Sequence, residues 1–164
     1  MIKKKLIKNA RKIDQFLIKF LKKQQSSLLV RPMKYGVISG GKKIRSTIIF
    51  DAGKIFNISE KKLINICAAV ECIHSYSLIH DDLPCMDNDT IRRGKPATHI
   101  KFGEASAVLA GSSLLTLAFE IIADKKYLLS PKAKNEIIKS LASCSGHTGI
   151  AGGQELDLKF ENKK

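Results

Sequence analysis

The sequence predicts an all-α protein, and three observations support that class. Apolar side chains recur at the helical spacing of three and four residues, and Leu, Ile and Ala dominate these stretches. Only four prolines interrupt the 164 residues. The apolar fraction of 44% is sufficient for a packed core. We therefore expect one helical domain over residues 1–164.

Six helices are expected from the apolar periodicity. They are predicted over residues 3–23, from Ile44 onward, over 60–83, over 102–122, over 133–143 and within 146–158. The first is amphipathic and docks on a core; a membrane-surface helix is the alternative. Residues 24–36 and 87–98 are expected to be connections, because Arg31-Pro32 and a polar run break the periodicity.

Three of these helices carry more detailed expectations. In the second, the apolar spacing predicts a buried side made of Ile44, Ile48, Ile49 and Ala52. The 60–83 helix is apolar around most of its circumference, so we expect it to be central and buried, capped by Asn57 or Ser59 and ended by Pro84. Pro131 suits the first turn of a helix.

The charge is concentrated at one end of the chain. The net charge is +14, and residues 1–50 carry fourteen basic side chains against one acid, Asp14. Such an arm can be attracted to nucleic acid or an anionic membrane. Aromatic residues are few in it and no nucleic-acid motif appears, so we expect a solvated basic face and no nucleic-acid partner.

The cysteines and the longest apolar run indicate a cytoplasmic protein. No C-x-x-C pair occurs among the four cysteines, which favours free thiols in a reducing compartment. No signal peptide is visible. The run 105–122 is nearly long enough to span a membrane, but its serines, threonine and Glu120 favour a buried core helix without stable membrane insertion.

A cluster of charged residues follows the central helix. It comprises four carboxylates and then three bases: Asp81, Asp82, Asp87, Asp89, Arg92, Arg93 and Lys95. Mg²⁺ is usually held by one or two carboxylates together with substrate phosphates, and arginine forks bind phosphate oxygens. This stretch therefore offers both halves of a metal–diphosphate site.

A second candidate anion site begins at Gly40-Gly41. The two glycines allow a ligand to approach the backbone closely, and Lys42 and Arg45 share one face at the start of the next helix. Helix N-termini favour anions. A Gly-Gly-Lys motif is weak support by itself, and taken alone it favours an ordinary helix start with solvated bases over a phosphate site.

His74 lies on the same face of the central helix as Glu71 and Asp81. A core histidine and a ligand-binding histidine are both compatible with this position. Glu71-Cys72-Ile73-His74 also fits the Glu-x-x-His motif of di-iron bundles, but such sites need a second copy. Neither His99 nor His147 has a glutamate three residues before it, so we reject that alternative.

Three motifs together resemble the trans-polyprenyl diphosphate synthases, most closely the bacterial farnesyl diphosphate synthase type. They are Gly40 to Arg45, Asp81 to Asp87 with Arg92-Arg93, and Gly153 to Asp157. The likeness runs from about Tyr35 to Leu158. It implies an isoprenoid synthase helical bundle and a homodimer. The implied activity is a Mg²⁺-dependent condensation of isopentenyl diphosphate with dimethylallyl or geranyl diphosphate to farnesyl diphosphate.

The resemblance also implies roles for individual residues. Isopentenyl diphosphate would be bound by Lys42, Arg45, His74 and Arg93. Asp81 and Asp87 would hold Mg²⁺ with support from Asp82, and Arg92 would bind the allylic diphosphate beside Gln154 and Asp157. Tyr76 and Ser77 would limit product length, with the Tyr76 ring as the floor of the channel; an ordinary core tyrosine is the alternative.

The sequence departs from the family pattern in three places. It ends at Lys164, before a second aspartate-rich motif, so we expect a bundle incomplete at its C-terminus, and activity of this chain alone is in doubt. Ser46 stands where proline is usual, and Ser112 where aspartate is usual. A non-catalytic diphosphate-binding or partner subunit is therefore the alternative function.

Overall fold

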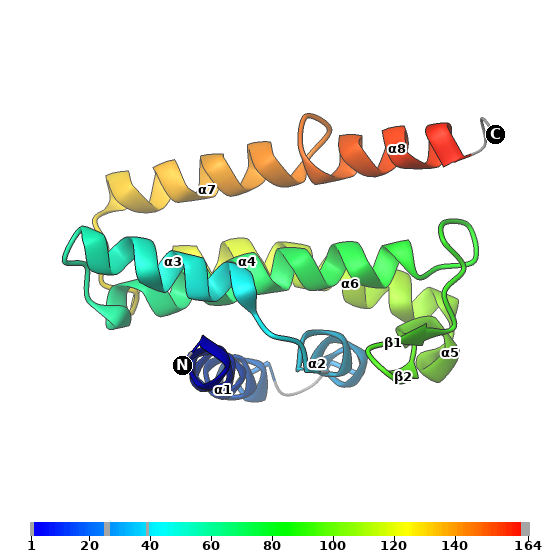
Figure 1. Ribbon diagram of the computed structural model, residues 1–164, viewed down its shortest axis with the longest axis horizontal. Coiled ribbons are helices and arrows are strands. Elements are labelled where there is room, and N and C mark those ends of the chain that lie inside the picture. Colours follow the sequence, from blue (N-terminus) through cyan, green and yellow to red (C-terminus); the bar gives the residue numbers. More distant parts are fainter. Residues whose placement is uncertain (1, 25–26, 39, 162–164) are drawn as a thin grey trace. The chain divides into compact units, whose positions relative to one another are not determined.

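The computed structural model describes residues 2–24, 27–38 and 40–161, and it is mainly α-helical, which confirms the predicted class (Figure 1). The chain forms two compact units, residues 1–127 and 128–164. The expectation of a single domain over residues 1–164 stays a prediction. The described elements are α1 Ile2–Lys22, α2 Val30–Ile38, α3 Ile44–Ile55, α4 Glu60–Asp81, β1 Ile91–Arg92, β2 Lys95–Pro96, α5 Thr98–Phe102, α6 Glu104–Ala123, α7 Pro131–Ser145 and α8 Ile150–Glu161.

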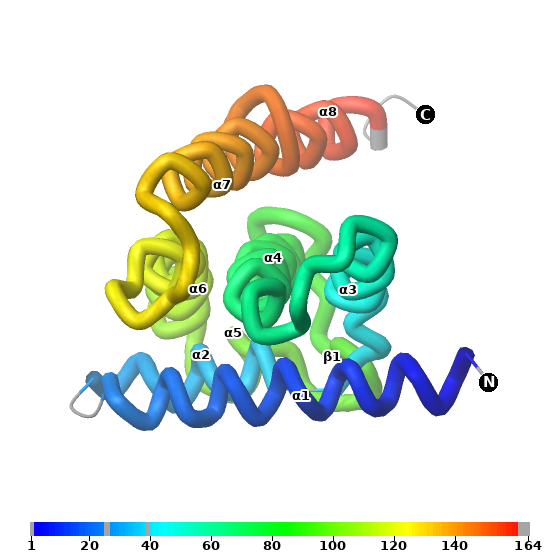
Figure 2. The backbone as a smooth tube through the Cα atoms, turned by 90° about the vertical axis from the view of Figure 1, so that its left-hand side faces the viewer, coloured from blue at the N-terminus to red at the C-terminus, as the bar shows by residue number. Residues whose placement is uncertain are grey.

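Helix α4 is the central helix of the first unit, as predicted. Figure 2 shows α4 between α3 and α6, with α1 crossing beneath it. Cys67, Ala68, Ala69 and Cys72 are fully buried, and the small alanines allow neighbouring helices to approach closely. The helix ends at Asp81, two residues before the predicted end, and Ser59 occupies its N-cap position without a side-chain capping bond.

Helix α1 confirms the predicted amphipathic helix along most of its length. Its Ile13, Leu17 and Leu21 are almost completely buried against the core. Its first two turns differ from the expectation, since Ile7 is 44% exposed. In Figure 2 this end of α1 extends past α3.

Helix α2 was wrongly predicted to be part of a connection. Pro32 is the third residue of this helix. The first four N–H groups of a helix have no partner within it, so a proline in the first turn removes no hydrogen bond. The expected polar connection over 87–98 contains a two-residue antiparallel hairpin, in which Arg92 pairs with Lys95. Gly103, with φ +87°, separates the short helix α5 from α6.

Helix α3 buries a different face from the one predicted. Ile44 and Ile48 are 50% and 61% exposed, and Ala52 is also exposed. The buried face consists of Ser46, Thr47, Phe50 and Gly53. Two of these are polar and are satisfied by distant partners: Asn9 donates to Thr47 Oγ1 at 3.1 Å, and Ser46 Oγ donates to Glu71. Apolar spacing could not reveal a face held by long-range hydrogen bonds.

The second unit contains α7 and α8. Pro131 is the first residue of α7, as predicted, and Ser130 caps this helix by accepting a bond of 3.3 Å from the Ala133 N–H. Helix α8 begins at Ile150, within the predicted 146–158 element.

Two helices of the first unit, α4 and α6, are long and apolar enough to cross a membrane by length and composition alone. This is weak support for a membrane protein, because core helices pass the same test. Ala107, Ala110 and Leu114 of α6 lie in the core, as predicted, but Val108 and Leu109 are 41% and 53% exposed, so only one face of this helix is buried and the prediction of a buried helix holds in part.

Helices α4 and α6 form the most extensive helix pair of the first unit, and His80 of α4 packs directly against Gly111 of α6. The His80 ring occupies the space that a Cβ on Gly111 would need, and His80 Nε2 lies 3.1 Å from the Val108 carbonyl oxygen. We expect Gly111→Ala to lower the free energy of unfolding by about 1–3 kcal/mol, because His80 must move out of a packed interface. Urea unfolding followed by circular dichroism measures this.

Gly153→Ala is the control for that experiment. Gly153 lies within α8 with open space around its Cβ position, so alanine is expected to be neutral or to stabilise by up to about 1 kcal/mol through helix propensity. A neutral or stabilising Gly111→Ala variant contradicts the packing described here.

Candidate functional site

The end of α4 brings two carboxylate-bearing residues together. The chain turns sharply after Asp81, and the Asp87 N–H donates to the Asp81 carbonyl oxygen at 2.9 Å. Asn88 N–H donates to the Leu83 carbonyl at 3.1 Å and closes the same turn. No group of three metal-ligating side chains occurs among the described residues. Two carboxylates suffice for Mg²⁺ when phosphate oxygens complete its shell, so the donor set fits that ion.

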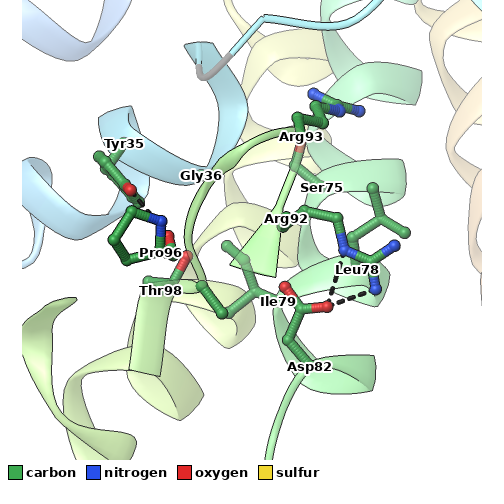
Figure 3. Close-up of a pocket in the computed structure, with 11 residues that line it drawn as sticks. Tyr35, Gly36, Ser75, Leu78, Ile79, Asp82, Arg92, Arg93, Pro96 and Thr98 are labelled. Carbon is green, nitrogen blue, oxygen red and sulfur yellow. Dashed lines mark hydrogen bonds and ion pairs between the residues drawn. The ribbon is translucent and has the colours of Figure 1, made fainter. Parts of the chain in front are cut away.

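The Asp82 carboxylate pairs with the Arg92 guanidinium in this structure. Its side chain is buried and accepts a bond of 2.8 Å from Arg92 Nε and a second from Arg92 Nη2 (Figure 3). Asp89 Oδ2 accepts from the same Nη2 at 3.0 Å. Burial raises the pKa of Asp82, and the hydrogen bond and charge of Arg92 oppose that rise. The expected role of Asp82 as support for the metal pair stays a prediction, as does diphosphate binding by Arg92.

Arg93 joins the β1–β2 hairpin to the loop that contains Gly40 and Gly41, here called the glycine loop. Its backbone lies in the left-handed region, with φ +54°, and its Nη1 donates to the Gly40 carbonyl oxygen at 2.6 Å. Gly41 has φ +99°, and a Cβ there would come within 2.7 Å of Arg93 Cζ. The structure therefore brings together two motifs that lie about fifty residues apart in the sequence.

The two consecutive lysines after Gly41 have opposite environments. Lys42 is exposed, as is Arg45. Lys43 is buried in the left-handed conformation, with its Nζ 3.0 Å from the Val37 carbonyl oxygen and 3.3 Å from Asp14 Oδ1. Because Lys43 is anchored to α1 and α2, its neighbour Lys42 is left on the surface. The sequence carried no signal for this difference, since both residues are lysines at a helix start.

The N-terminus of α3 already holds an anion from the protein itself. Glu71, buried on α4, accepts from Ser46 Oγ at 2.8 Å and from the Ser46 N–H at 3.3 Å. The Ser46 N–H group is therefore already occupied, and the prediction that this helix start favours an anionic ligand stays a prediction. Serine at position 46 supplies two donors that proline lacks.

His74 lies half-buried where the positive charges converge. Burial, and after it the nearby positive charges of Arg45, Arg93, Lys43 and Arg92, together lower the pKa of His74 to about 4. The ring is therefore neutral near pH 7. Five basic side chains, counting the exposed Lys42 of the same loop, surround or adjoin this face of α4, an arrangement that favours an anionic ligand.

The structure gives the positions of the remaining predicted residues but does not test the roles predicted for them. Tyr76 is 6% exposed and its ring contacts His80 edge-to-face at 5.5 Å, while Ser77 Oγ donates to the His74 carbonyl at 3.0 Å. Gln154 and Asp157 lie three residues apart on α8, in the second unit. Product-length control and contact with an allylic ligand stay predictions.

Comparison with known proteins gives concordant matches. The polyprenyl synthetase family model matches residues 26–164. The farnesyl diphosphate synthase of Escherichia coli K12 is 49% identical over 140 residues, covering 85% of this chain and 47% of the relative. That of Bacillus subtilis 168 is 44% identical over 137 residues, covering 83% of this chain and 46% of the relative. The chain spans about half the length of these relatives.

Solved structures agree with this similarity. A geranyltransferase from Legionella pneumophila matches with a TM-score of 0.88 and 37% identity, covering 96% of this chain and 56% of that one. An FPP/GFPP synthase from Zymomonas mobilis matches with a TM-score of 0.85 and 41% identity, covering 95% of this chain and 58% of that one.

The contact between Gly41 and Arg93 can be tested with a matched pair of glycines. Gly40 and Gly41 have φ of +96° and +99°, but only a Cβ on Gly41 meets Arg93. Alanine at either position has the same backbone cost. We expect Gly41→Ala to weaken binding of inorganic diphosphate at least about fivefold more than Gly40→Ala, because it displaces a charge-assisted donor. Calorimetry measures both affinities, and equal losses contradict the prediction.

The pKa of His74 reports on the anion site directly. Because the pKa of about 4 lies below the ordinary 6.5, the unfolded chain binds more protons between these pH values. Stability is therefore expected to fall as the pH drops from about 6.5 to about 4, and His74→Gln should reduce that fall. Inorganic diphosphate should move the pKa of His74 upward, because its charge offsets the surrounding cations.

Proton NMR titration of the His74 ring measures this change. Arg45→Gln should weaken the effect of diphosphate on His74, whereas Lys19→Gln, an equal charge loss on the exposed face of α1, should not. A ring whose titration does not respond to diphosphate is incompatible with an anion bound at this face of α4.

Proposed function

Because this chain belongs to the polyprenyl synthetase family, we propose that it serves prenyl transfer, the condensation of isopentenyl diphosphate with dimethylallyl or geranyl diphosphate to farnesyl diphosphate. The observation that supports the proposal is the contact of Arg93 with Gly40, which joins the glycine loop to the hairpin that follows residues 81–89, here called the aspartate loop. The names of the matched relatives, farnesyl diphosphate synthases and geranyltransferases, support the same reaction.

Isopentenyl diphosphate is the ligand we assign to the cationic face around His74. Lys42 and Arg45 are exposed there, and Arg93 reaches the same loop from the hairpin. A diphosphate carries more negative charge than one cation neutralises, so several converging bases suit it. The neutral His74 ring contributes a hydrogen bond to the bound diphosphate.

The allylic diphosphate is the ligand we assign to the aspartate loop. Asp81 and Asp87 would hold Mg²⁺, which neutralises the diphosphate and stabilises its departure. Arg92, positioned by Asp82 and Asp89, would add a phosphate contact on this side. Gln154 and Asp157 are proposed to lie beside the allylic substrate.

The proposed reaction uses the two diphosphates in these two positions. The allylic C–O bond breaks and the diphosphate leaves with the electron pair, so that an allylic cation forms. The isopentenyl double bond attacks that cation, and a proton then passes to the released diphosphate. The chain's own residues hold both diphosphates, which orients the double bond toward the cation and converts an encounter of two substrates into one bound arrangement.

Tyr76 and Ser77 are proposed to set product length. Tyr76 precedes Asp81 by five residues on α4, about one and a half helical turns deeper in the bundle. A rigid ring there would stop a growing chain near fifteen carbons. We also propose a cytoplasmic homodimer that needs no nucleic acid for this role.

A second candidate function is a diphosphate-binding or partner subunit without turnover. It is favoured by the convergence of Arg45, Arg93, Lys43 and Arg92 around His74, which suits binding of a diphosphate whether or not turnover follows. Calorimetry on this chain with isopentenyl diphosphate, with and without Mg²⁺, combined with a prenyl-transfer assay, separates the two. Binding without turnover supports the subunit; turnover supports the enzyme.

The enzymatic proposal can be tested by joining residues 1–164 to the part of the Escherichia coli relative that this chain does not cover. We expect this chimera to form farnesyl diphosphate only with Mg²⁺. Asp81→Asn with Asp87→Asn should lower kcat about 100-fold or more, because the leaving group loses its stabilisation. Asp51→Asn, at a surface ion pair with Lys5, is the matched control and should leave kcat unchanged.

Product analysis completes this test. Tyr76→Ala should extend the product beyond fifteen carbons if the ring is the floor of the channel. A folded chimera that binds both substrates and forms no prenyl product overturns the proposed reaction, whereas an unchanged product length overturns only the role of Tyr76.

A further inference from the structure

A second cationic surface lies away from the bases around His74. It is a groove of about 350 Å³ along α2, β2 and α5, and we call it the Tyr35 groove. Four bases and two aromatic rings form most of its lining: Arg31, Lys34, Lys95, Lys101, Tyr35 and Phe102. None of these bases belongs to the cluster that surrounds His74.

The four bases carry uncompensated charge. Within the described part of the chain, none of them forms an ion pair with a carboxylate, whereas Lys5, Lys12, Lys43 and Arg92 each do. No acidic side chain lines the groove. Four like charges around one small concavity repel one another, and a bound anion would relieve that repulsion.

The aromatic residues hold part of this surface in place. Tyr35 Oη donates to the Pro96 carbonyl oxygen at 2.7 Å, and the Tyr35 ring contacts Phe102 edge-to-face at 5.3 Å (Figure 3 shows Tyr35 beside Pro96). Lys101 Nζ lies 4.3 Å from the centre of the Tyr35 ring, a favourable cation–π distance. The ammonium is thus held at the groove, which lowers the entropy lost when it contacts a ligand.

We propose that the Tyr35 groove binds a phosphate-bearing ligand, of the chemical class of a diphosphate or a clustered phosphate ester. One carboxylate would neutralise one of four charges, whereas a diphosphate supplies about three negative charges and many acceptor oxygens in a small volume. Arg31 offers a planar fork for two phosphate oxygens and the lysines offer point charges. The volume lies within the usual range of about 300–1,000 Å³ for small-molecule sites.

The experiment uses the full chain with Arg45→Gln and Arg93→Gln, which weakens the cationic face around His74. Calorimetry with inorganic diphosphate should still show one site in this background. Adding Lys34→Gln and Lys101→Gln should weaken that site about tenfold, since two charge-assisted contacts are lost. Adding Lys19→Gln and Lys22→Gln, an equal charge loss on α1, should change the affinity less than twofold.

NMR of the unaltered chain gives an independent readout of position. Diphosphate should shift the ring signals of Tyr35 and Phe102. A parallel arm uses phosphatidylcholine vesicles with and without phosphatidylglycerol: binding that depends on phosphatidylglycerol and on Lys34 and Lys101 identifies a lipid headgroup as the source of phosphate, and binding of free diphosphate alone identifies a soluble ligand.

Three results overturn the proposal. They are unmoved Tyr35 and Phe102 signals in both arms, equal losses in the Lys34/Lys101 and Lys19/Lys22 variants, and tighter binding of a hexaglutamate peptide than of diphosphate. The binding test uses a variant already weakened at the cationic face around His74, so it does not depend on whether the protein catalyses prenyl transfer. If the Tyr35 groove fails this test, the proposed reaction is unaffected.

Discussion

The burial of polar groups along α4 is the constraint on which the rest of the first unit depends. A helix enclosed by α1, α3 and α6 cannot leave such groups without partners, because each unmatched group costs about 1–3 kcal/mol. Glu71 is satisfied by Ser46 at the start of α3, and Asn65 donates to the Ile121 carbonyl oxygen of α6 at 3.2 Å. These hydrogen bonds hold α3 and α6 in position against α4. The positions of α3 and α6 in turn determine where the loops at their ends lie.

The same constraint assembles the candidate site. Asp82 follows α4 directly, is buried, and holds Arg92 on the hairpin. The next residue, Arg93, then reaches Gly40 on the loop before α3. Positive charge accumulates beside the neutral ring of His74, and Asp81 lies about two helical turns further along α4. This arrangement of one helix and its two adjoining loops is the basis for the proposed site for two anions, one of them with a metal.

Much of this fold could be predicted from the sequence, because strong apolar periodicity marks α1, α4, α6 and α7. Helix α2 was missed because Pro32 breaks helices in their interior but not in their first turn. The face of α3 was misassigned because Ser46 and Thr47 are buried by hydrogen bonds to partners far along the chain. The residue types of the site were foreseen, but the inward position of Lys43 and the cap from Glu71 arise only from tertiary packing.

The central proposal is that the glycine loop and Arg93 bind one diphosphate and the aspartate loop binds a second one beside it, both at the same end of α4. A crystal structure of this chain grown with Mg²⁺ and inorganic diphosphate tests it most directly. We predict one diphosphate within hydrogen-bond distance of Lys42, Arg45 and Arg93, and Mg²⁺ on Asp81 and Asp87 contacting a phosphate oxygen of a second diphosphate. An ordered diphosphate that contacts neither Lys42 nor Arg93, with the carboxylates of Asp81 and Asp87 turned away from any metal, would contradict it.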